Sequence, residues 1–157
     1  MTDAAQWQKV AGALRELHRA LIERARRDYE RERLAVVNPG ELLQLLATDP
    51  YFEWLRSLSE LMVDIDMARD LEPELKSDLV SAVRPAVEHL ITAPTAGDDH
   101  PFADHYWPYV QDDPHVAMAH AAVKQAVSSW PLSEPNDAAT RMHERHRLAE
   151  KARHRKR

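Results

Sequence analysis

Apolar residues recur at helical spacing in four separate segments of this chain, and no segment shows the alternation expected of a half-buried strand. The clearest segment lies within residues 4–33. Its apolar side chains follow one another at intervals of three and four residues: Trp7, Val10, Leu14, Leu17 and Leu21, continued weakly by Ala25 and Tyr29. This spacing places them on one face of an amphipathic helix. We expect a single helix over residues 4–33.

The second half of this helix is dominated by charge. Eight of the ten residues in 24–33 are charged. Glu23 and Arg27 have the four-residue spacing that allows an ion pair along a helix. The pattern predicts that this half runs past the core into solvent.

Capping residues mark where the next two helices begin. Asn38 precedes Pro39, and Glu41 lies at the distance of a capping box, so a short helix should extend to about residue 47. Asp49 and Pro50 repeat the arrangement before a second apolar stripe, formed by Phe52, Leu55, Leu58, Leu61, Met62 and Ile65. Asp64 and Asp66 flank Ile65, and we expect both to be solvated.

Two further stripes follow, separated by a segment without periodicity. The first begins after Pro73 and comprises Leu75, Leu79, Val83, Val87 and Leu90; Pro85 within it predicts a kink or two separate helices. The last begins at Asp113 and Pro114 and comprises Val116, His120, Val123, Val127 and Trp130. Residues 92–112, with three prolines and a glycine, are predicted to be a long irregular loop.

These elements predict an all-α fold: an antiparallel bundle of four long helices and one short helix, with the long loop before the last core helix. A chain of 157 residues is long enough to bury a core of its own. We expect one domain over residues 1–136, followed by a basic tail over residues 137–157 that is either helical or disordered.

Composition excludes several classes of chemistry. The chain has no cysteine, which rules out disulfides, thiolate nucleophiles and iron–sulfur clusters. Its three isolated glycines cannot form a glycine-rich phosphate loop. The sequence shows neither a secretory signal nor an apolar run long enough to span a bilayer. We expect a cytoplasmic protein without membrane association, and the missing catalytic motifs favour a function other than catalysis.

Charge is divided unevenly along the chain. Residues 34–130 carry five Lys/Arg against sixteen Asp/Glu, which disfavours nucleic-acid binding by the body. Residues 137–157 carry eight basic residues against three acids. The basic residues are Arg141, Arg145, Arg147, Lys151, Arg153, Arg155, Lys156 and Arg157. This tail predicts either a solvated terminus or electrostatic contact with nucleic acid or an acidic partner.

Residues 98–120 are rich in histidine and suggest a metal site. The candidate ligands are His100, His105, His115 and His120, and the candidate groups are a divalent metal or haem. The first two histidines are five residues apart, and so are the last two. That spacing is about 140° on a helix, so neither pair can chelate an ion from one intact helix. No histidine has a glutamate three residues before it, which argues against a di-iron carboxylate site. A site would need the loop to fold over the last helix.

His120 is the one histidine at an apolar-stripe position. We expect it to be a core histidine that hydrogen-bonds to a backbone carbonyl or to a tyrosine such as Tyr106 or Tyr109. Four aromatic residues lie close together just before it: Phe102, Tyr106, Trp107 and Tyr109. Such a group either binds a protein partner or seals one end of the bundle.

One stretch carries a resemblance. Residues 38–66, "NPGELLQLLATDPYFEWLRSLSELMVDID", resemble a segment found in small uncharacterised bacterial helical proteins. The resemblance implies a bacterial source and assigns no site residue. The sequence therefore favours a non-catalytic protein that acts through protein–protein contact, as a regulator, an adaptor or a homodimer. A metal- or haem-binding protein is the alternative, and nucleic-acid contact through the tail is a weaker one.

Overall fold

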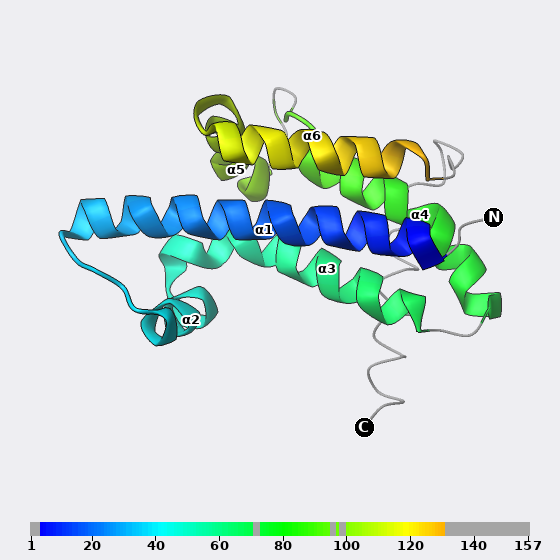
Figure 1. Cartoon of the computed structure of the whole chain (residues 1–157), viewed down its shortest axis with the longest axis horizontal. Helices are drawn as coiled ribbons and strands as arrows, with labels where there is room; N and C mark the ends of the chain where they lie inside the picture. The colour runs from blue at the N-terminus through cyan, green and yellow to red at the C-terminus, as the bar shows by residue number, and fades with distance from the viewer. Residues whose placement is uncertain (1–3, 71–72, 95–96, 98–99, 131–157) are drawn as a thin grey trace.

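The computed structural model describes residues 4–70, 73–94, 97 and 100–130, and of residues 73–79 the backbone alone. Within these ranges the chain forms six α-helices and one 3₁₀ helix and contains no strand (Figure 1). The elements are α1 (Ala4–Arg33), α2 (Pro39–Thr48), the 3₁₀ helix η1 (Pro50–Leu55), α3 (Arg56–Arg69), α4 (Pro73–Ile91), α5 (Pro101–Asp112) and α6 (Pro114–Ser128). The all-α prediction is confirmed for the described part of the chain.

Helix α1 occupies the centre of the arrangement. It lies between α3 and α6 and also contacts α5 and η1 (Figure 1). Its predicted apolar stripe is buried from Trp7 to Ala25, Tyr29 is half-buried, and Leu14, Leu17 and Leu21 are fully inaccessible. The helix begins and ends where the sequence predicts. The apolar periodicity that indicates the helix also supplies the face on which two other helices pack.

Helices α1 and α6 run antiparallel. Near the start of α1, the side-chain amide of Gln6 donates a hydrogen bond to the backbone carbonyl of Ser129, at the end of α6. Near the end of α1, Arg24 reaches Asp112 and Asp113, just before α6 begins. The two helices therefore lie side by side along most of their length.

Helix α4 closes the core against α3, α5 and α6. Its residues Val83, Val87 and Leu90 are buried, as predicted, whereas Leu75 and Leu79 lie outside the described side chains. The indole of Trp130 donates a hydrogen bond to the Val80 carbonyl at 2.6 Å, which ties the end of α6 to this helix. Pro85 lies within α4, which continues through it, so the alternative of two separate helices is wrong.

Residues 101–112 form helix α5, and the prediction of a continuous irregular loop is wrong there. The His100 side chain caps the helix by accepting a hydrogen bond from the Ala103 backbone N–H at 3.3 Å, and Pro101 occupies the first turn. Pro108 lies inside the helix and lacks an N–H to donate. The sequence pattern misleads here because histidine is not a typical cap and closely spaced prolines favour a loop.

The charged second half of α1 does not run free into solvent, which corrects a second prediction. Asp28 is only 7% exposed, and the Tyr29 ring packs against Tyr51 and Phe52 at centroid distances of 5.2 and 5.4 Å. Glu23 pairs with Arg26 instead of Arg27. Exposure rises only at the end of the helix, where Leu34 adopts a positive φ of 52° and is 94% exposed.

Two features of the third predicted helix also differ. Asp49 is the N-cap, as predicted, but the residues that it caps, 50–55, form the 3₁₀ helix η1, and α3 begins only at Arg56. Asp64 is buried, with 2% exposed, whereas Asp66 is exposed as expected. Asp64 shares its helical face with Leu61, Ile65 and Ala68, and α3 packs against both α1 and α4. The buried face is therefore wider than a single stripe.

Candidate functional site

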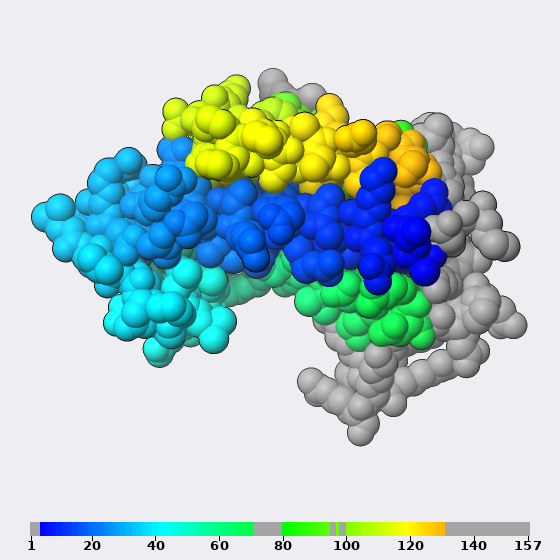
Figure 2. Space-filling view, viewed as in Figure 1, coloured from blue at the N-terminus to red at the C-terminus, as the bar shows by residue number. Residues whose placement is uncertain are grey.

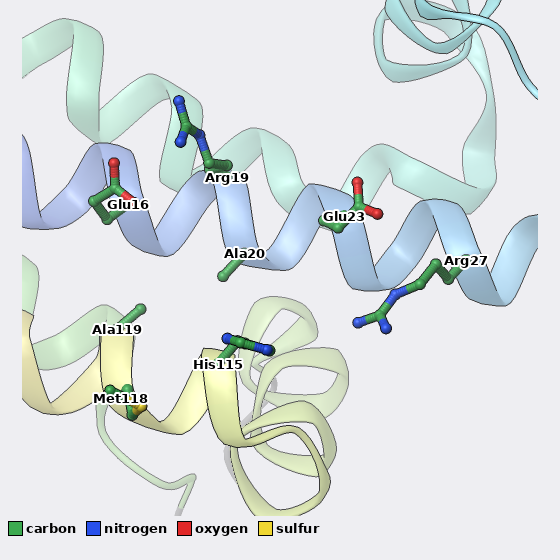
Figure 3. A pocket seen from close by; sticks show the side chains of 8 residues that line it. All are labelled: Glu16, Arg19, Ala20, Glu23, Arg27, His115, Met118 and Ala119. Atoms are coloured by element: carbon green, nitrogen blue, oxygen red, sulfur yellow. The ribbon is translucent and has the colours of Figure 1, made fainter.

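A groove of about 550 Å³ that is open to solvent lies between α1 and α6, and it is called here the α1–α6 groove. The two helices lie next to each other across the face of the molecule seen in Figure 2. The groove is lined by Glu16, Arg19, Ala20, Glu23 and Arg27 of α1 and by His115, Met118 and Ala119 of α6 (Figure 3). It combines a small apolar centre with charged edges.

The centre of the groove contains small side chains beside one large exposed one. Ala20 and Ala119 face each other between the helices (Figure 3). Met118 is 72% exposed, although large apolar side chains are normally buried in a helical core. Met118 lies on the α6 side of these two alanines (Figure 3), and a flexible thioether is a typical adaptable contact group.

An ion network fixes one end of the groove. The guanidinium of Arg24 contacts Asp28 at 3.3 Å, Asp112 at 2.6 Å and Asp113 at 3.4 Å. Arg27 adds a second contact to Asp113, at 3.2 Å. These carboxylates hold the pKa of Arg24 above its ordinary value, with Asp112 the largest contributor. The network therefore joins α1 to the start of α6.

Asp113 has a second role as the N-cap of α6. Its carboxylate accepts hydrogen bonds from the backbone N–H groups of His115 at 2.9 Å and Val116 at 3.4 Å. Burial alone would raise the pKa of this carboxyl, but these backbone hydrogen bonds and Arg24 outweigh burial and lower it. Asp113 is therefore a charged carboxylate at neutral pH, and it orients the wall of the groove that carries His115 and Met118.

The four candidate metal ligands lie against different neighbours. His100 caps α5 and packs against His89 at 5.0 Å, and His105 stacks on Trp54 at 5.3 Å. His115 lines the α1–α6 groove, whereas His120 lines a separate cavity of about 260 Å³ beside α4. Over the described ranges, no three histidine, aspartate or glutamate side chains are gathered as a metal site requires.

The expected hydrogen bond between His120 and a tyrosine is confirmed, but the side chain is half-buried and not in the core. The Tyr106 hydroxyl and the Nδ1 atom of His120 are 2.5 Å apart in a hydrogen bond. Tyr106 is fully buried, and burial raises its pKa, so the hydroxyl retains its proton and donates to the imidazole. Burial and the nearby Lys124 ammonium lower the pKa of His120. This is the hydrogen bond of a neutral histidine at the edge of the core.

The aromatic group divides between core and surface. Phe102 and Tyr106 are buried and stack on each other at 5.0 Å, so they seal the core beneath α5 and offer no surface to a partner. Trp107 and Tyr109 are half-buried. The guanidinium of Arg24 lies 5.0 Å from the centre of the Tyr109 ring, which links this group to the ion network.

One serine and one histidine approach each other, but their surroundings do not suit catalysis. The Nε2 atom of His18 lies 3.0 Å from the Ser59 hydroxyl, which also contacts the Leu55 carbonyl at 3.3 Å. Ser59 lies inside α3, where neighbouring N–H groups are used by the helix and cannot stabilise an oxyanion. The Ser59 hydroxyl donates a hydrogen bond to the Leu55 carbonyl and accepts one from the His18 N–H. The pair is therefore a structural contact between α1 and α3.

Sequence reasoning missed the α1–α6 groove. On a helical projection, Met118 interrupts the polar face of α6, and Arg19, Glu23 and Arg27 share one face of α1. The sequence therefore contained both halves of the groove. What it lacked was the knowledge that these faces are neighbours. The basic tail, Arg141 to Arg157, lies outside the described residues, and its predicted contacts stay predictions.

No described helix combines the length and apolar character needed to cross a membrane. Comparison of the chain with protein-family models, with curated proteins and with solved structures finds no match. The candidate site is therefore defined by its own geometry: an exposed methionine and two facing alanines, bordered by charges of both signs.

Proposed function

We propose that the protein is a non-catalytic interaction module that binds a helix of another polypeptide in the α1–α6 groove. The observation that carries the proposal is Met118, 72% exposed on a groove that is already formed. Exposed apolar side chains grouped in a concavity and bordered by polar residues are typical of protein contact sites.

The shape of the groove supports a helix as the occupant. Two neighbouring helices present a shallow channel, and the alanine side chains at its floor allow a third helix to approach closely. The charged residues along its edges can pair with charges on the flanks of that helix. An incoming apolar residue would cover Met118 and remove it from water.

The rigidity of the walls also supports binding. The contacts of Arg24 and Arg27 to Asp113 hold α6 against α1 before any partner arrives. A surface that is ordered in advance loses less conformational entropy on association. The same contacts would oppose the movement that a lid or a hinge requires.

Site-specific photo-crosslinking tests the proposal. A photoreactive amino acid replaces Met118 in one variant and Leu43, which is 71% exposed on α2, in a matched control. We expect a crosslinked polypeptide from position 118 that is absent from position 43. The crosslinked chain, once identified and purified, should bind the wild-type protein and lose at least tenfold in affinity with Met118→Asp.

Two results would count against the groove as a binding site. Equal labelling from positions 118 and 43 would show that exposure alone drives the reaction. Unchanged affinity of the purified partner for Met118→Asp would place its binding surface elsewhere.

A further inference from the structure

Four charged residues along the groove edge of α1 alternate in sign. The same row in reverse order therefore has the opposite charge at every position. In chain order Glu16, Arg19, Glu23 and Arg27 alternate in sign. At 100° per residue they lie within about 80° of one another, so they form one charged row. In the reverse direction the row begins with the arginine Arg27. If a reversed row is laid beside a forward one, each charge lies opposite a charge of the other sign.

The centre of this pattern coincides with the apolar centre of the groove. Glu16 and Arg27, and likewise Arg19 and Glu23, are arranged about a midpoint near residue 21. Ala20 lies at that level and faces Ala119, the neighbour of Met118 (Figure 3). An apolar centre flanked by charged residues is the usual anatomy of a protein interface.

Resting on the proposed function, we infer that the helix bound at the α1–α6 groove is α1 of a second copy of this chain, antiparallel to the first. A two-fold axis perpendicular to α1 near residue 21 brings Glu16 opposite Arg27 of the other copy. The same axis brings Arg19 opposite Glu23. Met118 of each copy then lies near the axis, covered by its counterpart.

A parallel arrangement of the two helices is disfavoured by the same residues. It would place Glu16, Arg19 and Glu23 each opposite its own copy, so that every pair would repel. The antiparallel arrangement pairs all four positions with opposite charge. The direction and the register of the contact are therefore set by the sequence of α1.

The internal contacts of the row are compatible with this contact. Arg27 reaches Asp113 while its side chain stays 53% exposed, and Glu23, which pairs with Arg26, stays 52% exposed. Exposed ion pairs of this kind contribute little individually and are screened by salt. The dimer should be weak, and its dissociation constant should rise with ionic strength.

Charge reversal followed by mixing tests the register. Glu23→Arg and Arg19→Glu each place like charges opposite one another in a self-dimer, and we expect each variant alone to be monomeric in sedimentation equilibrium. At positions 19 and 23 the first variant carries two arginines and the second carries two glutamates. In an equimolar mixture each of these arginines therefore meets a glutamate of the other chain. We expect the mixture to recover dimers that contain one chain of each variant.

Matched controls separate the contact from the fold. Thermal unfolding monitored by circular dichroism should show both variants folded; if either is not, Glu23→Gln and Arg19→Gln replace them and should weaken the dimer less. Met118→Asp should abolish dimers, whereas Leu43→Asp, at an equally exposed apolar position, should leave them unchanged.

The outcomes distinguish this inference from the proposed function. Wild-type protein that stays monomeric over the attainable concentration range, or a mixture that does not recover dimers, would overturn the second copy as the partner. If position 118 still crosslinks a different polypeptide, the groove remains an interaction site. If it crosslinks nothing either, both proposals fail.

Discussion

Arg24 joins three carboxylates, and its replacement gives a sharp test of how α1 and α6 are held together. Arg24→Met keeps much of the aliphatic stem and removes the guanidinium. Asp28 and Asp113 have side chains only 10% and 5% exposed, so both lose a partner while remaining out of water. Removing one partner of a buried pair costs about 3–5 kcal/mol.

The expected loss is smaller than that limit because each carboxylate keeps another partner. Asp28 retains Arg31 at 3.0 Å, and Asp113 retains Arg27 at 3.2 Å together with the backbone N–H of His115. The Asp112 side chain is 69% exposed, so that contact adds little. We expect Arg24→Met to lower the free energy of unfolding by about 2 kcal/mol.

Urea denaturation followed by circular dichroism measures this change, with Arg15→Met as the control. Arg15 lies on the exposed face of α1 outside the groove, so this replacement should change stability by less than about 0.5 kcal/mol. The cost of Arg24→Met should also shrink in acid. The pKa of Asp113 is lowered in the folded protein, so its stabilising effect is present above pH ~4 and is lost as the pH falls through the folded value. A loss under about 0.5 kcal/mol at neutral pH would refute the network as a source of stability.

Three further predictions concern single positions. Gly12→Ala should stabilise the protein by roughly 0.5–1 kcal/mol in urea denaturation, because Gly12 lies inside α1 and an added Cβ meets its nearest atom at an ordinary 3.8 Å. Leu34→Gly should raise the urea midpoint, because Leu34 has a positive φ of 52° and loses no buried contact. The pKa values of His18 and His120 are lowered by burial, so the unfolded state binds protons more readily and stability should fall as the pH drops below ~6.5. The double variant His18→Gln, His120→Gln should flatten that dependence.

The outcomes that contradict these three predictions are distinct. A destabilising Gly12→Ala would mean that close packing at this position outweighs helix propensity. An unchanged midpoint for Leu34→Gly would show that its backbone conformation carries no strain. A stability profile of the double variant identical to that of the wild type would assign the pH dependence to other groups.

The sequence predicted the helices that are marked by an apolar stripe or by a capping residue before a proline. The stripe from Trp7 to Leu21 specified α1, and the Asn38–Pro39 and Asp113–Pro114 pairs specified where α2 and α6 begin. In each case the signal is local: the stripe repeats every three or four residues, and each cap accepts hydrogen bonds from backbone N–H groups two or three residues away.

What the sequence could not predict depends on contacts between distant residues. The burial of Asp28 and the role of Asp113 as acceptor for α1 depend on how α1 and α6 meet, and Arg27 and Asp113 are separated by 86 residues. The prediction for Asp64 is wrong because a helix packed on two sides buries more than one stripe. The α1–α6 groove exists only once two helices from opposite ends of the described chain lie together.

The position of α1 also has a consequence for how this chain folds during synthesis. Helix α1 leaves the ribosome before α6, which covers one of its sides, so the contact between Gln6 and Ser129, 123 residues apart, forms only after α6 has been made. Contacts of such long range slow folding, since a large loop must close before they form. Until then the side of α1 that packs on α6 is exposed in the nascent chain, and exposed apolar surface of this kind promotes aggregation.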